Sequence, residues 1–168
     1  MLGGTSADAG KAAEPEGTDM DRLYFEDFSV GQVFRSGEHR LTAEEIKGFA
    51  SQYDPQPFHL DEKAAAGSFF RGLAASGWHT AAITMRLLVQ RGLPIAGGVI
   101  GAGADELRWP RAVRPGDTLH VESEVLETRS SASRPESGWV KARSTTRNQD
   151  GDAVQILVAN LIVPRRTG

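Results

Sequence analysis

The apolar and polar residues of this chain follow one period in the first part of its foldable region and another in the second. In residues 43–53 the apolar positions recur at spacings of three and four, which predicts a short amphipathic helix. Thr42 and Glu45 have the form of a capping box at the start of that helix. Residues 76–91 are apolar on nearly every side, which predicts a helix surrounded by protein.

After the second helix the period changes to two, which is typical of strands. A first strand is expected within residues 31–40, before the helices. Turn residues separate the later strands, so we expect them to form an antiparallel meander. One buried helix followed by such a meander predicts an α+β fold in which a strongly curved sheet wraps around the helix. The four later segments are residues 99–109, 118–128, 139–148 and 153–163.

The chain has 168 residues, enough for one domain with a hydrophobic core. Residues 1–20 have almost nothing to bury, so we expect a disordered extension followed by a single domain over residues 21–168. A net charge of −3 gives no general attraction to nucleic acid. There is no apolar run of membrane-spanning length and no signal-peptide core, and the chain contains no cysteine. We therefore expect a cytoplasmic protein without nucleic-acid or membrane partners.

The segment Asp54-Pro55-Gln56-Pro57-Phe58-His59 carries the chemistry that stands out most. Side chains five positions apart lie on different sides of a helix and on opposite faces of a strand. The two prolines predict a stiff, kinked loop instead, which could aim Asp54 and His59 at one point. A carboxylate and an imidazole that share a water molecule make a general acid–base pair. The same residues also fit a turn-capping Asp54 and a hydrogen-bonded, half-buried His59.

Together with the predicted helix and meander, this motif resembles the MaoC-like dehydratases, relatives of (R)-specific enoyl-CoA hydratases with the hot-dog fold. The resemblance covers about residues 24–164. The catalytic loop of that family runs Asp-x-Asn-Pro-x-His, so Asp54, Pro57 and His59 match it by position. Two residues depart from the family pattern. Gln56 replaces the asparagine, and Ser76 replaces the histidine of a His-Gly pair that opens the central helix.

The resemblance implies a hydro-lyase of fatty acid metabolism that adds water to an enoyl thioester, such as an enoyl-CoA, or removes it. Asp54 and His59 would be the catalytic pair, and the sequence leaves open which of them is the base. The thioester oxygen would bind at the helix N-terminus by Gly77, with Ser76 and Gln56 as further substrate-binding candidates. No cofactor is expected beyond the coenzyme A of the substrate. No metal site is expected, because the histidines lack ligand spacing and cysteine is absent.

Two other functions stay open. A hot-dog acyl-CoA thioesterase typically uses one carboxylate without a histidine five residues later, so His59 counts against it. A non-catalytic acyl-CoA binding protein would account for the departures at Gln56 and Ser76.

Further expectations concern assembly and the other basic residues. Hot-dog relatives protect the edges of their curved sheet by pairing subunits, so we expect at least a homodimer with the active site near the interface. His79, one turn inside the central helix, is expected to make a polar core or interface contact. Four arginines could meet the phosphates of coenzyme A, namely Arg71, Arg108, Arg111 and Arg114.

Overall fold

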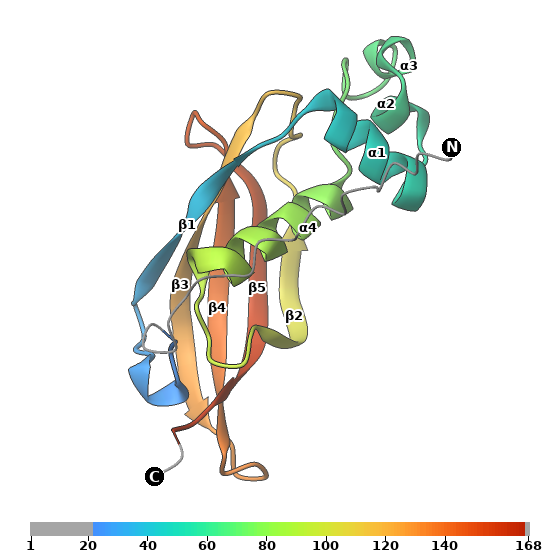
Figure 1. Cartoon of the computed structure of the whole chain (residues 1–168). Coiled ribbons are helices and arrows are strands. Elements are labelled where there is room, and N and C mark those ends of the chain that lie inside the picture. The colour runs from blue at the N-terminus through green and yellow to red at the C-terminus, as the bar shows by residue number, and fades with distance from the viewer. Residues whose placement is uncertain (1–21, 167–168) are drawn as a thin grey trace, which may run out of the picture.

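The computed structural model describes residues 22–166, so the predicted extension over residues 1–20 lies outside the described part. Five antiparallel strands form one sheet that curves around helix α4 (Figure 1). This confirms the predicted α+β architecture. The helices are the 3₁₀ helix η2 (Phe25–Asp27), α1 (Ala43–Tyr53), α2 (Pro57–Leu60), α3 (Glu62–Ala66), α4 (Gly77–Leu87) and the π-helical turn η3 (Leu88–Gly92). The strands are β1 (Val33–Arg40), β2 (Ile100–Arg108), β3 (Thr118–Ser130), β4 (Ser137–Arg147) and β5 (Ala153–Pro164).

The strand order in the sheet is β1-β3-β4-β5-β2. Strands β3, β4 and β5 form the predicted meander. The prediction was wrong for β2, which pairs with β5 at the edge opposite β1 rather than with β3. The reason is the connection over residues 109–117, which contains two prolines and is too long for a tight hairpin. It carries the chain across the end of the sheet.

Helix α4 lies in the concave side of the sheet and buries one face there (Figure 1). Its buried apolar residues Ile83 and Leu87 join a core that includes Leu119 and Val121 of β3. The opposite face is exposed, with Trp78 and Met85 in contact with solvent, as is Val89 in the following turn η3. The prediction of a helix surrounded by protein is therefore wrong for a single chain. An apolar stripe on the side away from the sheet is what made the sequence look apolar all round.

The layer between α4 and the sheet is partly polar. The Thr84 hydroxyl lies 2.6 Å from that of Thr146, and the Ser123 hydroxyl lies 2.8 Å from that of Ser144. Each of these buried hydroxyls thus has a hydrogen-bond partner, as buried polar groups require. Among residues 22–166 no helix is both long and apolar enough to cross a bilayer.

Candidate functional site

The predicted motif lies where α1 ends and α2 begins. Asp54 is the C-cap of α1, and its N–H donates to the Ala50 carbonyl at 3.0 Å. Gln56 is extended, with φ −88° and ψ 142°, as expected for a residue before proline. Pro57 then occupies the first position of α2, where a missing N–H has no cost. The expected loop is thus partly helical, because His59 lies within a short helical turn.

This change of direction brings the two candidate catalytic side chains together. Asp54 Oδ2 lies 3.5 Å from His59 Nε2, which is longer than a strong hydrogen bond. The other ring nitrogen of His59, Nδ1, lies 2.7 Å from the Ala74 carbonyl oxygen. Because a carbonyl can only accept, Nδ1 carries a proton, and Nε2 is the ring nitrogen that faces Asp54. Asp54 and His59 thus meet, as the bend at the two prolines predicted.

The Asp54 carboxylate is held by its other contacts. Burial by itself raises the pKa of Asp54, but hydrogen bonds from Ser76 and Gln56 and the nearby His59 outweigh it, and the pKa lies below its usual value. The Gln56 side-chain amide donates to Asp54 Oδ1 at 2.7 Å. Asp54 is therefore ionised at neutral pH and can act as an acceptor. Gln56 and Ser76, the two departures from the family motif, both contact the carboxylate.

Ser76 connects this carboxylate to the N-terminus of α4. It is the N-cap of the helix, only 1% exposed, and its hydroxyl also accepts a hydrogen bond from the Trp78 N–H at 3.2 Å. A helix N-terminus has unpaired N–H groups and a favourable potential for negative charge. Asp54 and His59 therefore lie beside a helix end whose potential favours negative charge.

Gly77 has a packing role that the sequence did not reveal. A Cβ atom at this position would lie 2.7 Å from the indole ring of Trp109, so only glycine fits. The Trp109 indole N–H donates to the Gln155 side-chain oxygen at 2.8 Å, and its ring meets Trp78 edge to face. Trp109 therefore lies against the start of α4. An oxyanion contact at Gly77 stays a prediction.

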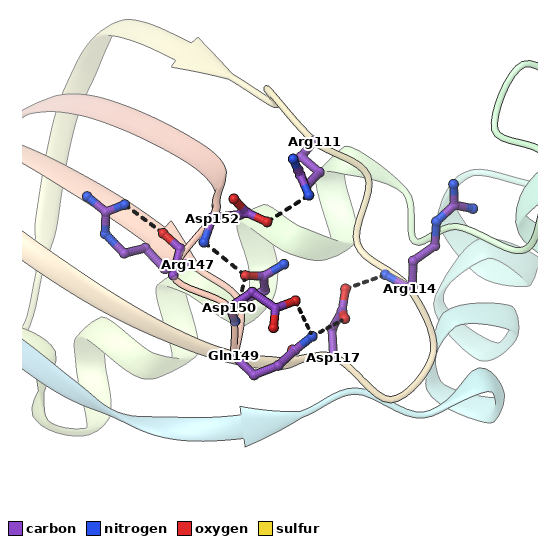
Figure 2. A network of polar contacts seen from close by, with 9 residues as sticks. Arg111, Arg114, Asp117, Arg147, Gln149, Asp150 and Asp152 are labelled. Atoms are coloured by element: carbon purple, nitrogen blue, oxygen red, sulfur yellow. Dashed lines mark hydrogen bonds and ion pairs between the residues drawn. The ribbon is translucent and has the colours of Figure 1, made fainter.

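Three of the four arginines considered for phosphate binding already have partners within the chain. Arg111 pairs with Asp152 at 2.7 Å, as Figure 2 shows, and Arg108 pairs with Glu106. The guanidinium of Arg114 donates to backbone carbonyls of residues 70, 72 and 73. Phosphate binding stays a prediction for this group, and Arg114 is the least suited to it, since its donors are directed at the chain.

Two surface cavities lie away from Asp54 and His59. A cavity of about 240 Å³ lies at the β3–β4 end of the sheet, lined by residues that include Ser133 and Trp139. Another, of about 330 Å³, is lined by Arg111 and Asp117 among others. Neither is lined by Asp54 or His59, so we assign the site from the chemistry of the groups rather than from hollow volume. Within residues 22–166 there is no cluster of three or more histidine, aspartate or glutamate side chains able to hold a metal ion.

Comparison with known proteins settles the family. The model of the MaoC like domain matches residues 27–148, most of the chain. The chain belongs to the MaoC-like domain family. This confirms the resemblance read from the sequence and, with it, the hot-dog architecture.

Individual relatives agree with this assignment. The crystal structure of the MaoC-like dehydratase from Rhodospirillum rubrum superposes with a TM-score of 0.85 at 57% identity, covering 87% of this chain and 99% of that one. The R-hydratase PhaJ1 from Pseudomonas aeruginosa gives a TM-score of 0.70 at 28% identity, covering 86% and 88%. The uncharacterized protein YdeM of Bacillus subtilis (strain 168) is 32% identical over 127 residues, 76% of this chain and 89% of YdeM. The family match and the likeness to these dehydratase and hydratase structures support a hydratase or dehydratase.

Proposed function

We propose that this MaoC-like protein is a hydro-lyase that adds water to the double bond of an enoyl thioester, or removes it, with enoyl-CoA as the substrate. The observation that carries the proposal is the 3.5 Å approach of Asp54 Oδ2 to His59 Nε2. Asp54 is ionised, and in the neutral form of His59 that carries its ring proton on Nδ1 both facing atoms are acceptors. Two acceptors at this distance suit one water molecule that donates a hydrogen bond to each.

The pair can carry out the addition without any other protein acid. As the water oxygen bonds to the β-carbon, the pair takes one proton from the water. The same pair then gives one proton to the α-carbon, so that H and OH add across the double bond and the protein returns to its starting state. A close pair of this kind titrates as a unit, and either member can be the base.

The N-terminus of α4 supports the same reaction. Negative charge develops on the thioester oxygen during attack at the β-carbon. We place that oxygen at the backbone N–H groups beside Gly77, where the helix dipole favours an anion. Loss of one such donor typically costs about 2.7–4 kcal/mol of barrier. Ser76 and Gln56 then act by holding Asp54 rather than by binding the substrate.

We further propose a homodimer. Strand β2 is an edge strand that is exposed along most of its length. The exposed stripe along α4 and η3, with Trp78, Met85 and Val89, is too apolar to favour permanent contact with water. Two chains that pair through β2 would continue the sheet and cover both stripes. Sedimentation at micromolar concentration tests this, and a monomer would contradict it.

One assay series tests the reaction. Purified protein is given crotonyl-CoA and longer or branched enoyl-CoAs, while the loss of enoyl absorbance and the release of thiol are both followed. Absorbance loss without thiol release supports the hydro-lyase. Thiol release would identify a thioesterase, and no reaction across the panel would favour a binding protein.

A cytoplasmic place in fatty acid metabolism belongs to the same proposal, because CoA thioesters are intracellular metabolites.

A further inference from the structure

Arg114 makes an unusual set of contacts for a partly exposed arginine. It lies in the connection between β2 and β3, where its backbone N–H donates to Asp117 Oδ2 at 2.7 Å (Figure 2). Its guanidinium points away from that turn toward the chain before α4. Nη1 donates to the carbonyls of Gly72 at 2.8 Å and Leu73 at 3.2 Å, and Nη2 donates to the carbonyl of Phe70. One side chain thus holds three carbonyls of a single loop.

This loop needs external support. Residues 67–76 form neither helix nor strand. Within them Arg71 has φ +53°, a left-handed conformation that a residue other than glycine adopts at a cost. Such a conformation persists only where surrounding contacts fix it. The three hydrogen bonds from Arg114 flank Arg71 on both sides, and they are the kind of contact that does so.

The same loop supplies two contacts of the acid–base pair. The Ala74 carbonyl accepts from His59 Nδ1, and the Ser76 side chain hydrogen-bonds Asp54. Between them, the Ala75 N–H donates to the Val113 carbonyl at 2.9 Å, next to Arg114 in the chain. The loop is therefore hydrogen-bonded to the β2–β3 connection at two places. Arg114 binds it just before Ala74, and Val113 binds it at Ala75, between the two residues that contact His59 and Asp54.

We propose that Arg114 is a positioning residue for the acid–base pair. It acts through the loop of residues 67–76 and makes no contact with the substrate. This inference rests on the proposed function of Asp54 and His59. The hydrogen bond to Ala74 keeps the His59 proton on Nδ1 and leaves Nε2 free as an acceptor. If Arg114 is lost, the Ala74 carbonyl shifts and His59 no longer has one preferred tautomer or orientation.

The test compares Arg114→Met with a matched variant, Arg147→Met. Arg147 also donates from its guanidinium to a turn carbonyl, that of Gly151 at 3.0 Å, but in the β4–β5 hairpin (Figure 2). We expect Arg114→Met to lower kcat for crotonyl-CoA hydration by about 10- to 100-fold with little change in KM, because small displacements of catalytic groups have effects of this size. Arg147→Met should keep the kcat of the unaltered protein.

Two further measurements separate positioning from simple support of the fold. In the ¹⁵N NMR spectrum of the free protein, His59 should show one tautomer in the unaltered chain and in Arg147→Met, and a mixture in Arg114→Met. The pH profile of kcat/KM should also change in Arg114→Met alone. Added guanidinium ion should restore part of the lost kcat.

An unchanged His59 spectrum and pH profile in Arg114→Met, with only a lower unfolding temperature, would overturn the proposal. If the methionine variant does not fold, Arg114→Gln gives the same readout with a shorter donor. The NMR comparison needs no turnover. If the unaltered protein hydrates no thioester, the proposed function fails, while the spectrum still decides whether Arg114 positions His59.

Discussion

Two polar clusters of this protein are built from similar side chains whose hydrogen bonds are arranged differently. One is the Asp54–His59 pair, and the other surrounds Asp117 and the β4–β5 hairpin (Figure 2). Burial does not distinguish them, since His59 is 4% exposed and Asp117 is 9% exposed. The difference lies in how the acceptor atoms are used.

In the hairpin cluster the side-chain oxygens are occupied by the protein itself. Asp117 accepts from the Arg114 N–H through Oδ2 and from the Gln149 amide through Oδ1. The side-chain oxygen of Asn148 accepts from the N–H groups of Asp150 and Asp152. Such groups stabilise a turn and have little capacity left for a ligand.

In the pair proposed to be catalytic, Asp54 and His59, each side chain is anchored through one polar atom and turns another toward its partner. Gln56 donates to Asp54 Oδ1 and the Ala74 carbonyl accepts from His59 Nδ1, while Oδ2 and Nε2 face each other at 3.5 Å. The comparison teaches that a polar group available for chemistry is one that the fold orients without using its reactive atom.

The most severe test of this difference is removal of the pair. Asp54→Asn and His59→Ala should each lower kcat by about 10²–10⁴-fold, the usual contribution of general acid–base catalysis. Asp54→Asn should lower stability little, because the amide keeps most of the contacts of the carboxylate. Steady-state kinetics and thermal unfolding measure the two effects. Full activity in either variant would remove the pair from the reaction.

Ser76→Ala sharpens the comparison by loosening an anchor and keeping the reactive groups. A hydrogen bond to a charged group is worth about 1.5–3 kcal/mol, so we expect kcat to fall by about 10- to 100-fold. Ser131→Ala is the matched control, because the Ser131 hydroxyl also accepts from a backbone N–H but lies in the β3–β4 loop. Equal kcat values for the two variants would show that the Ser76 contact does not matter.

Asn148→Ala should lower stability and leave activity nearly unchanged, the reverse of what Ser76→Ala should do. Its side-chain oxygen accepts two backbone N–H groups, and the residue is buried. Losing these two part-buried hydrogen bonds should lower the free energy of unfolding by about 0.5–1.5 kcal/mol each, whereas kcat should stay nearly unchanged. Urea denaturation and the hydration assay measure these quantities. A large loss of activity without loss of stability would contradict the division into two clusters.

The smallest expected effect concerns His79, a buried histidine that has no part in the proposed reaction. Burial lowers the pKa of His79, the charge of Glu45 raises it, His39 lowers it, and the net direction is down. The unfolded chain therefore takes up this proton at a higher pH than the folded chain. Stability from neutral His79 is complete above the unfolded value, near 6.5, and is lost as the pH falls below it.

His79→Phe should remove that loss and keep the ring that stacks on Phe49 at 4.5 Å. The difference in unfolding free energy between pH 7 and pH 5 should then be smaller than in the unaltered chain. Urea titrations at the two pH values measure it. An equal or larger difference would show that His79 does not cause this loss of stability at low pH.

Local signals predicted much of this molecule. The helix over residues 43–53 has the expected bounds, and both hydrogen bonds of the capping box form, between Thr42 and Glu45. The meeting of Asp54 and His59 was also predictable, since it follows from where one helix ends and a proline starts the next. In each case the deciding residues are close together in the sequence.

Contacts that depend on the backbone or on distant segments were not predictable. The contact between His59 and the Ala74 carbonyl cannot be predicted from the residue type at position 74, because every residue has a backbone carbonyl. Arg114 appeared suited to phosphate, and only the path of the loop shows that its donors are used by the chain. The partner of β2 depended on a long connection whose course no local pattern determines.

The placement of the indole rings offers a way to watch the site directly. Of the three tryptophans, Trp78 and Trp109 meet at the start of α4 with ring centroids 5.3 Å apart, while Trp139 lies on β4 beneath Arg129. In a Trp139→Phe protein, tryptophan fluorescence would come only from the two indoles next to Gly77. Occupancy of the helix terminus could then be followed optically, in real time and without turnover.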